Sequence, residues 1–134
     1  MLLRSLIACF DAQGARIWQN VVVSHIGSIC TDGTGKSVWV ACYTDGLRCF
    51  DAHGRERDAV RTQGSCRTAC CDFDGTLLLV AEESARLSLL KCDGTVLGSY
   101  AMPRNAAFVV LDGLGERGAF APATGPITLF ELKR

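Results

Sequence analysis

Short runs of alternating apolar and polar positions, each ended by a turn signal, make up most of this chain. Residues 37–43 alternate in this way and are rich in β-forming side chains, which predicts a strand with one buried face. The Asp-Gly pair at 45–46 predicts a two-residue hairpin turn into a strand at 47–50. After a turn at 51–54, residues 55–61 form a more polar strand. No sustained helical period occurs, so the pattern indicates an all-β fold.

The pattern returns every forty residues without an insertion. Each copy carries four predicted antiparallel strands, of which the last is polar. Four-stranded units at this period are typical of β-propeller blades, whose fourth strand lies at the solvent-exposed edge. The positions that agree in phase are Phe10-Asp11-Ala12-Gln13-Gly14 with Phe50-Asp51-Ala52-His53-Gly54 and Leu90-Lys91-Cys92-Asp93-Gly94; Asp32 with Asp72 and Asp112; Gly35 with Gly75 and Gly115; and Ile7 with Leu47, Leu87 and Ile127.

The copy at residues 21–60 resembles a WD repeat. Ser24-His25 stands where that family has Gly-His, and residues 44–51 resemble its strand–turn–strand segment ending in Trp-Asp, with Phe50 in place of the Trp. The resemblance implies that His25 and Asp45 join a buried hydrogen-bond network that stiffens the blade.

The other copies match this family less closely. Ser65 and Asn105 stand at the His position, and Ala85 stands at the Asp position of the next copy. Residues 9–18, Cys-Phe-Asp-Ala-Gln-Gly-Ala-Arg-Ile-Trp, are similar instead to the A-x-D-x-x-G-x-x-x-W run of pyrroloquinoline-quinone-type propeller repeats. Both resemblances imply the propeller fold.

The repeat divides the chain into about three blades, with strands a to d running from the inside of each blade outwards. Residues 1–20 supply strands c and d, residues 21–60 and 61–100 each supply a blade, and residues 101–134 supply a blade without its outer strand. Propellers close with about four to eight blades, so we expect the ring to be completed by association. Two alternatives for this association are open. The partner is either a second copy of the chain, which exchanges strands to give six blades, or a different protein that carries the remaining blades.

The eight cysteines are expected to be mostly buried, reduced thiols. A two-residue turn at 45–46 would place Cys42 opposite Cys49, as a possible thiol pair. Directly opposed Cβ atoms lie ~4.5–5.5 Å apart, whereas a disulfide prefers ~3.8 Å, so we expect two packed thiols. Cys30 and Cys70 are equivalent positions of neighbouring blades, and sheets packed ~10 Å apart are too distant for a bond.

The charge balance and the lengths of the apolar runs limit the classes of partner that this protein is expected to bind. Fourteen Lys and Arg balance fourteen Asp and Glu, which argues against nucleic-acid or anionic-membrane binding. No apolar run approaches the ~18 residues of a membrane span, and a soluble, cytoplasmic protein is the expectation. Residues 33–37, Gly-Thr-Gly-Lys-Ser, lack the first glycine of a phosphate loop and precede a strand. We expect no cofactor, no metal and no catalytic residue.

The sequence therefore favours a non-catalytic protein–protein interaction scaffold, completed by a protein partner or by a second copy of the chain. One alternative is a propeller that binds a small ligand or carbohydrate through Trp18, Trp39 and Tyr43. These aromatic residues do not recur in phase, since Trp39 aligns with Leu79 and Ala119. A subunit of a larger redox assembly is the other alternative, suggested by the cysteine count.

Overall fold

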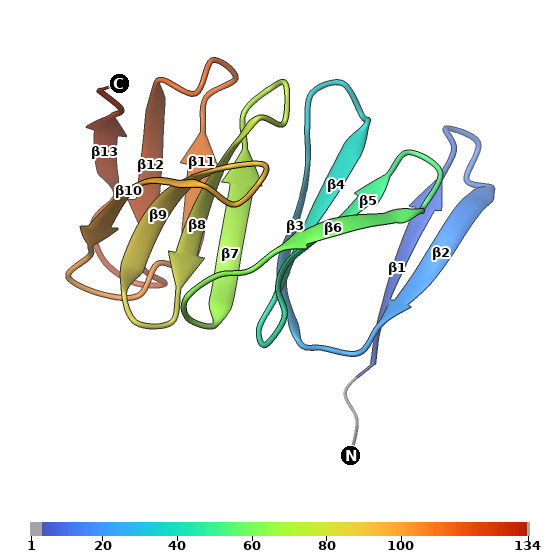
Figure 1. The fold of residues 1–134 in the computed structure, drawn as a ribbon, viewed down its shortest axis with the longest axis horizontal. Coiled ribbons are helices and arrows are strands. Elements are labelled where there is room, and N and C mark those ends of the chain that lie inside the picture. Colours follow the sequence, from blue (N-terminus) through green and yellow to red (C-terminus); the bar gives the residue numbers. More distant parts are fainter. Residues whose placement is uncertain (1–3, 134) are drawn as a thin grey trace.

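The computed structural model describes residues 4–133, and all of their regular structure is β-strand (Figure 1). The strands form four antiparallel sheets that follow one another along the chain. In Figure 1 they stand side by side in a row that runs from the N-terminal to the C-terminal sheet. The predicted all-β fold with four-stranded antiparallel sheets is confirmed. No helix in the described residues is long and apolar enough to cross a membrane.

We name the sheets by their order in the chain. The N-terminal sheet comprises β1 (Ser5–Phe10) and β2 (Arg16–Val22); the second sheet comprises β3 (Ile26–Thr31), β4 (Ser37–Cys42), β5 (Gly46–Asp51) and β6 (Glu56–Val60); the third sheet comprises β7 (Cys66–Cys71), β8 (Leu77–Glu82), β9 (Arg86–Lys91) and β10 (Val96–Ala101); the C-terminal sheet comprises β11 (Phe108–Leu111), β12 (Arg117–Ala121) and β13 (Thr128–Glu131). Strands β6 and β10 lie at sheet edges and are mostly exposed, as expected for a polar outer strand.

The aspartates that recur every forty residues stabilise the tight turns between strands. The Asp32 carboxylate accepts hydrogen bonds from the backbone N–H of Thr34 at 3.0 Å and of Lys36 at 3.1 Å, and from the Thr34 hydroxyl at 2.8 Å. Asp72 binds Thr76 in the equivalent turn, through backbone N–H and hydroxyl. Such side chains mimic a backbone turn. Burial alone would raise the pKa of Asp32, but these hydrogen bonds lower it.

Neighbouring sheets also touch through their innermost strands and turns. The Gly33 N–H donates to the Phe73 carbonyl at 2.8 Å, and the Phe73 N–H donates to the Gly113 carbonyl at 3.0 Å. At the other end of β3, a Cβ on Gly27 would lie 1.9 Å from the Arg67 carbonyl oxygen, so only glycine permits this approach. The inner strands therefore lie much closer together than the mean spacing of packed sheets.

Three apolar clusters fill the three spaces between sheets. The N-terminal sheet packs Ile7 and Val22 against the second sheet, the second sheet packs Leu47 and Trp39 against the third, and the third packs Leu79 against the C-terminal sheet. Side chains on alternate positions of one strand therefore serve two different clusters, one on each face of the sheet.

Candidate functional site

The two ends of the row of sheets each expose an apolar face. The C-terminal end face consists of Phe108, Val110, Ile127 and Leu129, which are 60–79% exposed. Their neighbours at alternate positions, including Val109 and Phe120, are buried against the third sheet. The N-terminal end face consists of Leu6, Phe10, Ile17 and Val21, also exposed. Contiguous exposed apolar patches mark interaction sites in soluble proteins.

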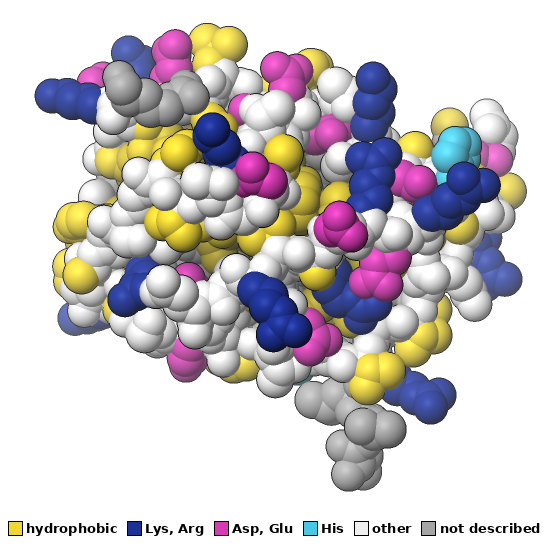
Figure 2. Space-filling model, in the orientation of Figure 1, with side chains coloured by type: hydrophobic (Ala, Val, Ile, Leu, Met, Phe, Trp, Pro, Cys, Tyr) yellow, Lys and Arg dark blue, Asp and Glu magenta, His cyan; other side chains and the backbone are white. Residues whose placement is uncertain are grey.

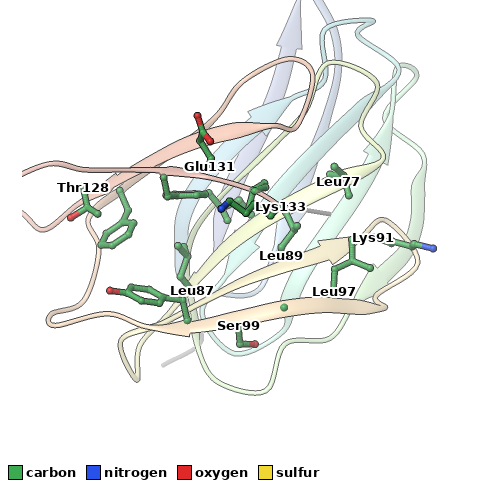
Figure 3. A pocket seen from close by; sticks show the side chains of 15 residues that line it. Leu77, Leu87, Leu89, Lys91, Leu97, Ser99, Thr128, Glu131 and Lys133 are labelled. Carbon is green, nitrogen blue, oxygen red and sulfur yellow. The ribbon is translucent and has the colours of Figure 1, made fainter.

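A groove of about 780 Å³ lies beside the C-terminal end, between the third and C-terminal sheets. Leu87 and Leu89 point into it (Figure 3), and Tyr100, Phe120 and Phe130 line it with ring centroids 6.1 Å apart from one to the next. Figure 2 shows hydrophobic side chains gathered over this part of the molecule, whereas charged side chains gather near β6. Such a lining suits packing against an apolar surface.

The two residues expected in a buried network, His25 and Asp45, are both exposed. The His25 ring packs edge-on against Tyr43 at 5.8 Å, and the Asp45 carboxylate contacts the Thr44 hydroxyl at 3.4 Å. The structure does not bring His25 and Asp45 together. In the later copies, the carboxamide oxygen of Asn105 accepts a hydrogen bond from the Ala85 N–H at 2.7 Å. A hydrogen bond therefore links the His position of one copy, Asn105, to the Asp position of the preceding copy, Ala85. It joins the loop before β11 to the third sheet.

The predicted register of Cys42 and Cys49 is wrong. The turn after β4 has three residues, 43–45, and Gly46 pairs with Cys42 at a φ of 75°. Cys49 consequently pairs with Trp39. The extra turn residue puts Cys42 in the cluster facing the N-terminal sheet and Cys49 in the cluster facing the third sheet. A three-residue loop that ends in a left-handed glycine is the alternative that the Asp-Gly signal did not distinguish.

The three aromatic residues considered for ligand binding lie in different environments. Trp18 stacks on Phe50 at 6.3 Å and donates its Nε1–H to the Ala52 carbonyl at 3.1 Å. Tyr43 donates its hydroxyl hydrogen to Glu83 at the surface. Trp39 is buried between the second and third sheets. These side chains do not converge on one pocket.

Trp39 nevertheless has an unusual surrounding. Among the buried side-chain nitrogen and oxygen atoms of residues 4–133, the Trp39 Nε1 is the one that has no hydrogen-bond partner. The ring lines a cleft of about 530 Å³ between the second and third sheets, with Lys36 and Arg57 on one side and Asp74 and Thr76 on the other. A buried donor without a partner is destabilising by about 1–3 kcal/mol.

The cysteines form a further group that the repeat pattern did not reveal. All eight are free thiols. Cys30 on β3 and Cys71 on β7 both pack against the cluster between the second and third sheets. The forty-residue alignment matches Cys30 with Cys70. In the structure, Cys30 shares its cluster with Cys71, the residue after Cys70. In the described part of the chain, no three His, Cys, Asp or Glu side chains are placed to hold a metal ion.

Comparison with known proteins supports the architecture. Among 606 matching chains of solved structures is hydrazine synthase of Kuenenia stuttgartiensis, with a TM-score of 0.70 over 79% of this chain. The fold is a partial β-propeller. The sequence identity is 12%, and the chain spans 32% of the length of that protein chain, so the likeness shows the fold alone. No protein-family model matches the sequence, and no curated protein matches it.

Proposed function

We propose that this chain is a non-catalytic protein–protein interaction scaffold whose propeller is completed by association with another chain. The observation that carries the proposal is the pair of apolar end faces, because each lies where a further sheet of a propeller would pack. The WD-like resemblance of residues 21–60 agrees with a role in binding proteins. The free thiols fit a reducing compartment such as the cytoplasm.

A second copy of the chain is the partner that best fits these faces. The N-terminal sheet has two strands in the outer positions and leaves Ile29, on the inner strand β3, 54% exposed. The C-terminal sheet has three strands in the inner positions. The inner strands of the C-terminal sheet of one copy can therefore combine with the outer strands of the N-terminal sheet of a second copy. Two such contacts related by a two-fold axis close a ring, and the net charge of zero gives no repulsion.

Strands β1 and β13 would compete for one position in the joined sheet, since Ile7 and Ile127 are in phase. Ile7 on β1 is buried, whereas its equivalent Ile127, just before β13, is 70% exposed. Strand β1 is therefore the better anchored of the two, and β13 is the strand that moves aside. The joined sheet then consists of β11 and β12 of one copy with β1 and β2 of the other.

The oligomeric state of the purified chain tests this proposal. Multi-angle light scattering over a range of concentrations should give twice the chain mass. Leu6→Asp and Val110→Asp, one on each end face and both on strands kept in the joined sheet, should shift the chain to monomer because a charge buried at the interface loses its hydration. Val96→Asp is the matched control, since Val96 is exposed on β10 away from both end faces.

Three results would overturn the two-copy ring. A monodisperse wild-type monomer with a cooperative melt would show that the end faces need no partner. Growth into open polymers would show that the contacts do not close. A dimer that both end-face variants leave intact would place the interface elsewhere.

A second candidate function, binding of a small polar ligand or carbohydrate, is favoured by the buried Trp39 Nε1 in its cleft. Once the cleft widens enough to uncover the indole N–H, the hydroxyl groups of a sugar can accept from it and pair with Lys36, Arg57 and Asp74. Trp39→Phe keeps most of the packing but removes this donor.

The test is the nuclear magnetic resonance signal of the indole N–H during titration with a panel of monosaccharides. We expect the Trp39 signal to move while the Trp18 signal, whose N–H already has a partner, stays in place. If neither signal moves, or if both move equally, the cleft is not a specific site.

A further inference from the structure

Cys30 and Cys71 face each other across the space between the second and third sheets. Cys30 pairs with Trp39 in the register of β3 and β4, and Cys71 pairs with Leu78 in the register of β7 and β8. Trp39 and Leu78 both belong to the cluster between these two sheets. Paired residues lie on one face of their sheet, so both thiols point into the same space.

Two hydrogen bonds hold the inner strands together on either side of this pair. The Ala69 N–H donates to the Ser28 hydroxyl oxygen at 3.0 Å. The Gly33 N–H donates to the Phe73 carbonyl at 2.8 Å. Cys30 lies between Ser28 and Gly33 along β3, and Cys71 lies between Ala69 and Phe73 along β7. The two cysteines are therefore placed side by side on strands that are in direct contact.

The thiols influence each other's ionisation. A hydrogen bond that Cys30 donates toward Cys71 raises the pKa of Cys30 and lowers the pKa of Cys71, so that Cys71 is the thiol that ionises first. By contrast, burial raises the pKa of Cys66 and of Cys70 to about 12. Both Cys30 and Cys71 also keep part of their surface exposed, so a small reagent can reach them.

We propose that Cys30 and Cys71 form a redox-active dithiol site, which small-molecule disulfides oxidise to a disulfide joining the second and third sheets. This site lies within one chain and is independent of how the propeller is completed. It gives the scaffold a bond that ties its two four-stranded sheets together under oxidising conditions.

The reaction is a thiol–disulfide exchange in two steps. The Cys71 thiolate attacks one sulfur of the small disulfide, whose S–S bond breaks and releases one thiolate. The Cys30 sulfur then attacks Cys71 in this mixed disulfide, forming the Cys30–Cys71 bond and releasing the second thiolate. The two protein thiol protons end on the two released thiols. The protein loses two electrons and the small disulfide gains them.

The next interface along the chain provides an internal control. Cys70 faces the space between the third and C-terminal sheets, where Leu111 is packed into the same cluster. Cys70 is thus adjacent in sequence to Cys71 but faces away from Cys30. Any oxidation that depends only on sequence position or on general exposure would treat Cys70 and Cys71 alike.

The experiment equilibrates the folded full chain with mixtures of oxidised and reduced glutathione, blocks free thiols under denaturing conditions, and maps disulfides by peptide mass spectrometry. We expect a peptide cross-link between Cys30 and Cys71, with the loss of two hydrogen atoms and a higher Tm. Cys30→Ser and Cys71→Ser should lose the cross-link, whereas Cys70→Ser should keep it. Cys30→Ala and Cys71→Ala replace any serine variant that does not fold.

Oxidation that leaves residues 30 and 71 unlinked in the folded wild type would overturn the proposal. So would a cross-link of Cys30 that survives in Cys71→Ser by using Cys70. A cross-link that forms only after the chain is unfolded would show that the strands of the native protein do not permit the bond.

Discussion

The interface between the second and third sheets and the C-terminal end face use equivalent positions of the repeat but differ completely in burial. Leu47, Leu87 and Ile127 are in phase, and their exposed fractions are 0%, 6% and 70%. Leu47 packs against the third sheet and Leu87 packs against the C-terminal sheet. The side chain at 127 has the same chemistry and direction, but no further sheet within residues 4–133 covers it. Burial is therefore decided by the neighbour and not by the position.

Equivalent positions on the inner strands also differ in burial, according to whether a preceding sheet covers them. Ala69 and Val109 on inner strands β7 and β11 are buried by the preceding sheet. Ile29, in phase with them on β3, is 54% exposed because the described part of the N-terminal sheet, β1 and β2, supplies no strand in the inner positions. The described sheets at the two ends of the row thus supply different strand positions.

The largest expected effect comes from removing equivalent apolar side chains at the two places. Leu47→Ala should lower the free energy of unfolding by about 2–5 kcal/mol, because it leaves a cavity in a closed interface. Ile127→Ala should change it by less than about 0.5 kcal/mol in the monomeric chain, as exposed substitutions do. Urea unfolding at low protein concentration measures both.

Raising the protein concentration sharpens this comparison. If the C-terminal end face is covered in the assembly, the effect of Val110→Ala, on strand β11 of that face, should grow with concentration while that of Leu47→Ala stays constant. Equal effects of the two substitutions at low concentration would contradict the difference in burial.

A smaller difference is expected between equivalent turn aspartates. Asp72 is buried and accepts hydrogen bonds from Thr76 and from the Leu77 N–H at 3.1 Å. Asp112 accepts from the Glu116 N–H at 2.8 Å near the C-terminal end and is more exposed. Asp72→Ala should cost about 1–3 kcal/mol because it leaves buried donors without a partner, and Asp112→Ala should cost less than Asp72→Ala. Thermal unfolding of both variants checks the order, and a larger loss in Asp112→Ala would reverse it.

The smallest effect concerns acid stability. Hydrogen bonds from Thr34 and Lys36 lower the pKa of Asp32 in spite of its burial. A lowered carboxyl pKa adds stability above the unfolded value of about 3.9, and this stability is lost as the pH falls through the folded value. The free energy of unfolding should therefore decrease from about pH 5 to about pH 3, and less steeply in Asp32→Asn. The slope is reduced but not abolished, because the pKa of Asp51 and of Asp112 is lowered too. An unchanged slope in Asp32→Asn would show that this turn does not contribute.

Local features were predictable because neighbouring residues determine them. Turns containing Asp and Gly, the β periodicity and the polar edge strand β6 all follow from short segments. The register of β4 and β5 was not predictable, because a turn of two residues and a turn of three residues both fit the same Asp-Gly signal. That single residue moved Cys42 and Cys49 to opposite faces of the sheet.

The candidate sites were predictable only in part. That the ends need a partner followed from the number of strands per repeat, but the residues of the two end faces required the packing. No sequence signal marked the buried Nε1 of Trp39, since it depends on which acceptors the folded chain leaves nearby. The exposure of His25 and Asp45 likewise depends on the loops around them.

The sequence by itself determined the repeated antiparallel sheet, since hydrogen bonding, turn chemistry and alternation act over a few residues. The tertiary structure decided which equivalent positions are buried, and it brought Cys30 to Cys71 instead of Cys70. The reason is physical. Inner strands of adjacent sheets approach closely enough for direct hydrogen bonds, and their offset of one residue comes from packing between segments some forty residues apart in the chain.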